Sequence, residues 1–187
     1  MIVSNTKIWP GLDWEAYAKT PGYSFSYLRN PDGVVPTAGM RLGTLVDRYL
    51  FTPGRYNGEQ RNLVEPMARE LVRHFGGALG MGESQISVTA DFEIDGLIMP
   101  YKGRPDFKIT DLIVDLKVSK MDVVKAVQFF RYDWQLSGYA LSTGCTRSMI
   151  LSINPTTLKI TPIAIPIVTD WWEYQIKQYG VPSLRVG

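Results

Sequence analysis

The sequence contains very few of the side chains that bind soft metals or carry redox chemistry, with one cysteine, Cys145, and one histidine, His74, in 187 residues. A single cysteine cannot form an intramolecular disulfide, and alone it cannot hold an iron–sulfur cluster or a structural zinc ion. Long apolar runs are also missing: no window reaches the ~18 apolar residues of a membrane span, and the N-terminal residues lack the apolar stretch of a signal peptide. These absences predict a cytoplasmic protein with no membrane partner.

Motifs of common small-molecule enzymes are absent as well. The sequence has no P-loop, no dinucleotide-binding glycine fingerprint, no nucleophile elbow and no Cys/His triad, which argues against unrelated small-molecule chemistry. The net charge is only +2, so charge alone does not identify a nucleic-acid-binding protein, although a local basic groove is compatible with it. Aromatic residues are plentiful, with five Trp and ten Tyr, and the length suits one folded domain.

The order of the predicted elements favours a single mixed α/β domain over residues 1–187. The helical segments follow from apolar residues at helical spacing, and the strands follow from alternating apolar residues bounded by turn signals. The residues before 37 are interpreted as short helical pieces and loops. The predicted parts are, in order, a helical part over 1–80 with helices at 37–51 and 59–80, a core sheet over 83–166 that includes a helix at about 122–142, and a last helix over 169–180.

The stretch 101–120 raises a physical question, because it places Asp106, Asp115 and Lys117 in a hairpin that otherwise has a buried character. A hairpin centred on Thr110-Asp111 pairs residues whose numbers sum to 221, so Asp106 lies opposite Asp115. Directly opposite residues point to the same face with Cβ atoms ~5 Å apart, and the period of two adds Lys117 to that face. The other face is left with apolar side chains that can serve as core: Leu112, Val114, Leu116 and Val118.

Two carboxylates directly opposite one another destabilise a strand pair, unless a cation lies between them or one acid is protonated. Oxygen ligands at this separation suit a hard ion such as Mg²⁺. A metal there could activate water and polarise a phosphate, and Lys117 could orient or deprotonate that water or meet the charge that develops. The alternative is a solvated strand face that carries an ordinary Lys–Asp pair.

These residues resemble a known nuclease motif. Pro105-Asp106 followed by Asp115-Leu116-Lys117 is similar to the PD-(D/E)xK signature, and Gln135-x-x-x-Tyr139 resembles the helix motif of its RecB-like and lambda-exonuclease-like branch. Upstream, TAGMRLGTLVDRYLFTP resembles a segment of phage and prophage exonucleases of the exonuclease VIII (RecE) type, and ESQISVTADFEIDGLIMPYKGRPDF also fits that branch. The resemblance runs from about residue 24 to residue 145, with the motifs in the right order.

The resemblance implies a fold and a reaction. The fold is a restriction-endonuclease-like core, in which a mixed central β-sheet is flanked by α-helices. The reaction is Mg²⁺-dependent hydrolysis of phosphodiester bonds in DNA, for which Mn²⁺ may substitute. The implied metal ligands are Asp106, Asp115 and the main-chain carbonyl of Leu116. Lys117 is implied to serve the attacking water. Gln135 and Tyr139 are implied to lie on a helix that leans toward the site and the DNA backbone.

Two further acids are candidate metal ligands. The branch usually has a metal-binding His where this chain has Asp47; Asp is also a hard oxygen ligand, and the alternative is a surface residue of the helix over 37–51. Glu83 lies ahead of the first core strand, and its alternative is a solvated acid at a strand edge. Four cations near the motifs are candidates for contacts with DNA phosphates: Arg41, Arg104, Lys120 and Arg131.

A second Gln-x-x-x-Tyr pair, Gln128 and Tyr132, continues the stripe of Gln135 and Tyr139 at helical spacing. Ordinary helix packing produces the same kind of stripe. The surrounding sequence, YDWQ followed by Tyr139, favours 135 and 139 as the functional pair.

The resemblance therefore predicts a phage-encoded exonuclease that resects double-stranded DNA ends for recombination, in the cytoplasm of a bacterial or phage-infected cell. Relatives form rings that encircle DNA, which implies a homo-oligomeric ring, and a single-strand annealing protein is the implied protein partner. The alternatives are a restriction-type or structure-specific endonuclease on the same fold and a catalytically inactive DNA-binding or assembly module.

Overall fold

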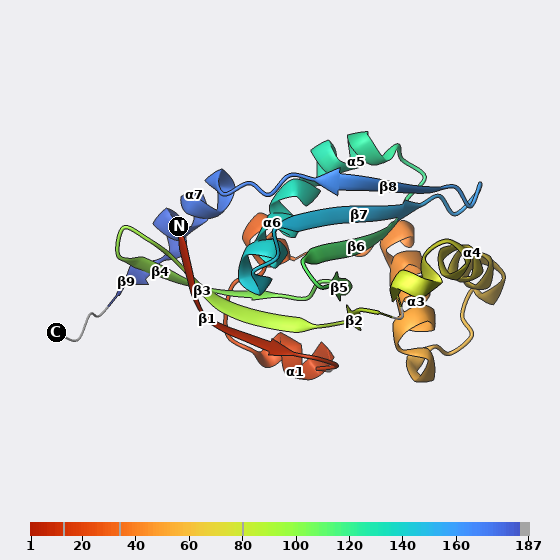
Figure 1. Cartoon of the computed structure of the whole chain (residues 1–187), viewed down its shortest axis with the longest axis horizontal. Helices are drawn as coiled ribbons and strands as arrows, with labels where there is room; N and C mark the ends of the chain where they lie inside the picture. Colours follow the sequence, from red (N-terminus) through yellow and green to blue (C-terminus); the bar gives the residue numbers. More distant parts are fainter. Residues whose placement is uncertain (13, 34, 80, 184–187) are drawn as a thin grey trace.

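The computed structural model describes residues 1–12, 14–33, 35–79 and 81–183, and its strands form two sheets (Figure 1). The first sheet has the order β1-β3-β4-β9, and the second has the order β2-β5-β6-β7-β8. The strands of the first sheet are β1 (Ile2–Trp9), β3 (Ser87–Ile94), β4 (Leu97–Gly103) and β9 (Val181–Pro182). Those of the second are β2 (Glu83–Ser84), β5 (Phe107–Ile109), β6 (Leu112–Val118), β7 (Arg147–Ile153) and β8 (Ile160–Ile165).

Helices flank both sheets, which confirms the predicted mixed α/β class; the second sheet is mixed, and the first is a further antiparallel sheet. The strands β6 and β7 run parallel and are joined by a helical crossover, whereas the other pairs are antiparallel. The helical elements are α1 (Trp14–Lys19), α2 (Phe25–Arg29), α3 (Ala38–Phe51), the 3₁₀ turn η1 (Pro53–Arg55), α4 (Arg61–Leu79), α5 (Val123–Phe130), α6 (Tyr132–Thr143) and α7 (Asp170–Tyr179).

The strand β1 was not predicted, because its sequence IVSNTKIW does not alternate cleanly between apolar and polar residues. The strand pairs with β3 from Ile2, opposite Glu93, to Trp9, opposite Ser87. The register shifts between Ser4 and Lys7, where Asn5 has a positive φ of 51°, so the side-chain alternation is interrupted as at a β-bulge. An edge strand that is mostly exposed needs no apolar face, and the usual signal is therefore weak.

The hairpin at the centre of the predicted site has the expected register. Phe107 lies opposite Val114, and Ile109 lies opposite Leu112, so paired residue numbers sum to 221. The turn at Thr110-Asp111 is closed by a positive φ of 47° at Thr110. Asp111 also accepts a hydrogen bond from the backbone N–H of Thr146, at 2.7 Å, which fastens the turn to the start of β7.

The predicted helix over about 122–142 is two helices. α5 ends at Phe130 and α6 begins at Tyr132, because Arg131 adopts a left-handed conformation with a φ of 54°. The Arg29 guanidinium donates to the carbonyl oxygens of Phe129 and Phe130, which satisfies backbone acceptors at the end of α5. This contact comes from a distant part of the chain, and helical periodicity does not reveal it.

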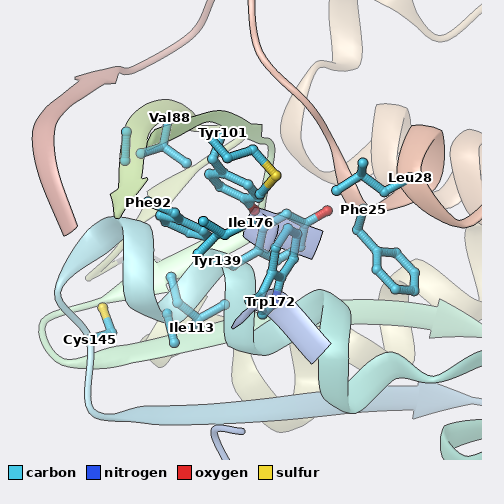
Figure 2. Close-up of a cluster of buried hydrophobic side chains, with 13 residues drawn as sticks. Phe25, Leu28, Val88, Phe92, Tyr101, Ile113, Tyr139, Cys145, Trp172 and Ile176 are labelled. Atoms are coloured by element: carbon cyan, nitrogen blue, oxygen red, sulfur yellow. The ribbon is translucent and has the colours of Figure 1, made fainter. Parts of the chain in front are cut away.

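The helix α6 lies between the two sheets, in contact with β1, β3 and β4 of the first and with β6 and β7 of the second. Figure 2 shows the cluster that it forms with the first sheet and α7, in which Phe92, Tyr101, Tyr139 and Trp172 come together. The Phe92 and Tyr101 rings are stacked with centroids 4.6 Å apart, and the edge of Trp172 meets both. This aromatic cluster fixes the position of α6 relative to β4.

The other face of the second sheet is covered by α3 and α4. α3 begins after Thr37, whose side chain accepts a hydrogen bond from the N–H of Met40. The apolar residues of β6 that were predicted to serve as core lie on this face, in one cluster with residues of both helices. Within the described ranges, no helix is both long enough and apolar enough to cross a membrane.

Gly138 marks the closest approach between α6 and the aromatic cluster, and we expect a Gly138→Ala variant to be destabilised. A Cβ at this position would collide with the Trp172 ring and come within 3.0 Å of Tyr101 Oη. Overpacking of this kind costs about 1–3 kcal/mol, although Ala is better than Gly in a helix by about 1 kcal/mol. Urea unfolding measures the difference, and Gly77→Ala is the matched control, because no atom lies within 4 Å of a Cβ there. Equal stability of both variants would contradict the packing described here.

Candidate active site

Asp106, Asp115 and Lys117 are brought together at the end of the β5–β6 hairpin. The residue Asp106 immediately precedes β5, and one of its carboxylate oxygens accepts a hydrogen bond of 2.8 Å from the N–H of Leu116 on β6. Asp115 is 2% exposed, and its carboxylate forms an ion pair with the Lys117 ammonium. The Oδ2 atom of Asp115 has no hydrogen-bond partner of good geometry among the described residues, although it takes part in that ion pair.

The carboxylates of this cluster affect one another's protonation. Burial raises the pKa of Asp106 well above its usual range, and the charges of Asp115 and Asp47 raise it further. The Asp47 pKa is raised to about 6, chiefly by burial and then by the charge of Asp115. Burial by itself disfavours the Lys117 ammonium, but Asp115, Tyr132 and Asp106 together raise the pKa of Lys117 above its ordinary value. Burial and like charges therefore raise the pKa of Asp106 and of Asp47 despite the nearby Lys117 ammonium.

Asp47 on α3 is connected to the hairpin through Gln85, a residue that sequence reasoning missed. The Gln85 side-chain amide donates to Asp47 at 2.7 Å, and its oxygen accepts from Arg104 Nε at 3.2 Å. The backbone N–H of Gln85 donates to the carbonyl oxygen of Asp106 at 2.9 Å. Gln85 has a positive φ of 51°, which is uncommon for a residue other than glycine, and no sequence signal marks it.

The helix α6 contributes the predicted pair Gln135 and Tyr139. Gln135 donates a hydrogen bond of 2.9 Å to Tyr139 Oη. Burial raises the pKa of Tyr139 well above its usual range, with the charge of Asp115 as the next cause, so this phenol lies near the carboxylates. Tyr132, at the start of α6, places its ring 4.8 Å from Lys117 Nζ. Tyr132 was assigned only to a packing stripe, and its contact with Lys117 depends on the break at Arg131.

A cleft of about 750 Å³ opens beside the cluster. Lys117, Gln135 and Tyr139 line it on one side, and Arg104 and Lys102 of the β4 segment line it on another. Its remaining walls come mainly from α1 and α2. Three predicted catalytic residues, Lys117 of β6 with Gln135 and Tyr139 of α6, therefore share one concave surface with Arg104, which was predicted to contact DNA.

Other predicted residues lie elsewhere. Glu83 is exposed on β2 opposite Lys108, and it is Gln85 that contacts Asp47 instead. Arg41 and Lys120 are exposed and are not among the residues that line the cleft. Arg131 forms an ion pair with Asp133 and lies over the Trp134 ring, so it stabilises the junction of α5 and α6.

The donor set fits a hard cation that keeps open positions for other ligands. Among the residues that the structure describes, no three His, Cys, Asp or Glu side chains form a ready-made metal cage. Mg²⁺ is commonly held by one or two carboxylates together with water and substrate phosphates, and Asp106 with Asp115 supplies two. Because the N–H and C=O of a strand residue point to the same neighbour, the Leu116 carbonyl points to the side on which its N–H meets Asp106.

No protein-family model matches the chain, and no curated protein matches it. Among solved structures, a phage-related exonuclease from Haemophilus somnus 129PT is 15% identical with a TM-score of 0.46, over 87% of this chain and 91% of that one. An alkaline exonuclease, LHK-Exo, from Laribacter hongkongensis is 14% identical with a TM-score of 0.42, over 84% of this chain and 83% of that one. Both TM-scores are below 0.5, so the chemistry of the site has to be taken from its side chains.

Buried Asp47 predicts a characteristic dependence of stability on pH in the presence of a chelator. Because its folded pKa is raised from 3.8 to about 6, the folded state holds the proton more tightly than the unfolded state. The resulting stability is present below about pH 3.8 and is lost as the pH rises to about 6, by about 3 kcal/mol. We expect Asp47→Asn to remove this loss, measured as the free energy of urea unfolding between pH 4 and pH 7.

Asp111→Asn is the control for this measurement. The Asp111 carboxylate is exposed, and hydrogen bonds from the side chain and backbone of Thr146 lower its pKa. A lowered pKa contributes stability that is lost as the pH falls, so this variant changes the pH dependence in the opposite direction. A curve for Asp47→Asn that runs parallel to the unsubstituted protein would contradict the buried, charged environment of Asp47.

Proposed function

We propose that the chain is a metal-dependent deoxyribonuclease of the PD-(D/E)xK superfamily that acts as an exonuclease on double-stranded DNA ends. The observation that carries the proposal is the proximity of Asp106, Asp115 and Lys117 at one end of the hairpin, where Asp106 accepts from the Leu116 N–H, Asp115 pairs with Lys117, and Lys117 lines a cleft with other cations. The resemblance of the sequence motifs supplies the reaction class. The geometry supports it because each motif residue contacts or faces another.

Asp106, Asp115 and the Leu116 carbonyl would hold the cation, and the charge of Asp47 lies close enough to Asp106 to raise the pKa of Asp106. A divalent cation bound there supplies Lewis acidity toward a phosphate and lowers the pKa of water. Lys117, which lines the cleft, presents its ammonium to the negative charge of a scissile phosphate. The hydrogen bond between Gln135 and Tyr139 orients both side chains at the same cleft, where they position the DNA backbone.

The finer parts of the proposal rest on the resemblance to the exonuclease VIII branch. They comprise a phage origin, a role in recombination, a homo-oligomeric ring that surrounds the DNA, and a single-strand annealing protein as partner. Light scattering of the purified protein tests the ring directly, because a monomer at all concentrations has no closed channel through which DNA could pass.

Substitution of the site residues is expected to abolish cleavage. With linear blunt-ended DNA and Mg²⁺, Asp106→Asn, Asp115→Asn and Lys117→Ala should each lower the rate by about 10²-fold or more, because each removes a ligand or a charge that acts on the reacting groups. Lys159→Ala, an exposed cation near β8, is the control. Full activity in the three site variants would remove the basis of the proposal.

A covalently closed circle in the same assay separates the two nuclease classes. An exonuclease leaves the circle intact, whereas cleavage of the circle would favour the endonuclease alternative. A protein that binds linear DNA but cleaves neither substrate with Mg²⁺ or Mn²⁺ would instead be the inactive module.

Metal binding is expected to raise thermal stability independently of any cleavage. A cation between like-charged carboxylates relieves their repulsion, and binding to the folded state alone stabilises it by about 2.7 kcal/mol at 100-fold excess over Kd. For a chain of this size, this corresponds to an increase in Tm of roughly 5 °C or more. Differential scanning fluorimetry with Mg²⁺ and Mn²⁺ measures it.

The increase should be lost in Asp106→Asn and Asp115→Asn and retained in Asp95→Asn. Asp95 lies in the β3–β4 turn with a φ of 51°, a conformation that Asn also tolerates. An increase of the same size in all three variants would place the bound cation at another site.

A further inference from the structure

The α1 wall of the cleft carries an exposed tryptophan. All five Trp residues lie within the described ranges, and among them Trp14 alone is exposed, with 63% of its surface accessible. The ring centroids of Trp14 and Tyr17 are 5.4 Å apart on α1. Both line the cleft together with Lys117. A large aromatic side chain that stays exposed inside a concave surface has apolar area available for a ligand.

Two cations, Arg104 and Lys102, lie against these rings, and the carboxylates whose charges act on Arg104 are those of Asp47 and Asp106. The Arg104 guanidinium carbon is 5.5 Å from the Trp14 ring centroid and 5.9 Å from that of Tyr17. Arg104 Nη1 is buried and has no hydrogen-bond partner among the described residues. The Lys102 ammonium lies 5.3 Å from the Tyr17 ring centroid, where it also donates to the carbonyl oxygens of Ala18 and Thr20.

The charge of the cleft suits a polyanion that also presents flat apolar surfaces. Among the described residues that line it are three cations, Lys102, Arg104 and Lys117, and no Asp or Glu. A buried donor without a partner is costly. A hydrogen bond from Nη1 of Arg104 to an anionic oxygen would remove that cost. An aromatic ring gains when another flat ring covers its open face. A nucleotide offers a phosphate and a base in the same ligand.

We propose that Trp14 and Tyr17 bind the base of an unpaired nucleotide by stacking, while Arg104 and Lys102 bind the adjoining phosphate. The inference rests on the proposed function, because it assigns a substrate segment to the same cleft. The substrate of the site is then a DNA strand that has separated from its complement next to the scissile phosphate. We call Trp14 and Tyr17 the stacking wall. The stacking wall contacts the same strand at a second point, in addition to the metal cluster.

Duplex DNA does not satisfy these contacts equally well. Both faces of a base inside a duplex are already covered by neighbouring bases, and only an unpaired or terminal base has a face free for a protein ring. Proteins that hold single strands combine a cationic groove with aromatic side chains on which bases stack, and they do so without strong sequence preference. The cleft has both features, which favours a single-stranded segment over an intact duplex.

Binding of two matched oligonucleotides in the presence of EDTA tests the inference. One probe is a fluorescein-labelled ten-residue oligothymidylate, and the other is an abasic oligonucleotide of the same length and charge. The unsubstituted protein should bind the oligothymidylate about 10-fold or more tightly than the abasic probe, because stacked bases contribute to the first complex alone. Fluorescence anisotropy measures both Kd values, and the chelator prevents cleavage.

Trp14→Ala should remove most of that 10-fold preference by weakening oligothymidylate binding, with little effect on the abasic probe. Trp14→Phe, which keeps an aromatic ring, should retain most of it and also shows that position 14 tolerates substitution. Arg104→Gln should weaken binding of both probes, because it removes a phosphate contact. Tyr174→Ala is the control, since Tyr174 is an equally exposed aromatic residue, 58% accessible, on α7 and outside the cleft.

A preference for the oligothymidylate that is the same in Trp14→Ala and Tyr174→Ala would overturn the stacking wall. The proposed nuclease function would survive that result if Asp106→Asn still abolishes cleavage. Conversely, loss of the preference in Trp14→Ala supports the stacking wall even if no cleavage is found, because the measurement is made without metal. The two proposals therefore fail on different observations.

Discussion

The close packing of α6 against the aromatic cluster is the contact on which the arrangement of the site depends. Gly138 brings the helix so near to Trp172 and Tyr101 that no side chain fits between them. Because α6 also contacts β6 and β7, this one approach fixes the first sheet, the helix and the second sheet relative to one another. Gln135 and Tyr139 lie on the same helix as Gly138. The close packing at Gly138 therefore also determines where these two side chains lie relative to Lys117.

The site combines this rigid frame with an unfavourable distribution of charge. Asp47, Asp106 and Asp115 come from three different elements, and burial together with mutual repulsion raises the pKa of Asp47 and Asp106. One ammonium, that of Lys117, compensates part of the negative charge. Folding alone does not explain such a cluster, since apolar residues of similar volume pack at lower cost. Cation binding does explain it, because a bound cation relieves the repulsion between the carboxylates.

Part of this arrangement follows from sequence because it depends on local periodicity. The register of the β5–β6 hairpin was predicted by centring the hairpin on Thr110-Asp111. The break at Arg131 was missed because a contact from Arg29 stabilises it. Gln85 was missed for a similar reason, since its hydrogen bonds join α3 to β4 across the fold. Contacts between distant segments decide these features, and a single sequence carries no periodic trace of them.

The turn at Thr110-Asp111 restricts how the chain can change in length. Since successive residues of a strand face opposite sides of a sheet, loss or gain of one residue between Phe107 and Val114 would carry Asp115 into the apolar layer beneath α3 and turn core residues toward the cleft. The hydrogen bond that Asp111 accepts from Thr146 ties the turn to the start of β7, which opposes a change in the number of turn residues. The loop at 154–159, which joins β7 to β8, has hydrogen bonds of its own, but it lies outside the hairpin and does not set the face to which Asp115 points. A change of length at 154–159 would therefore leave the register of the hairpin unchanged, whereas a change of one residue within the hairpin would not.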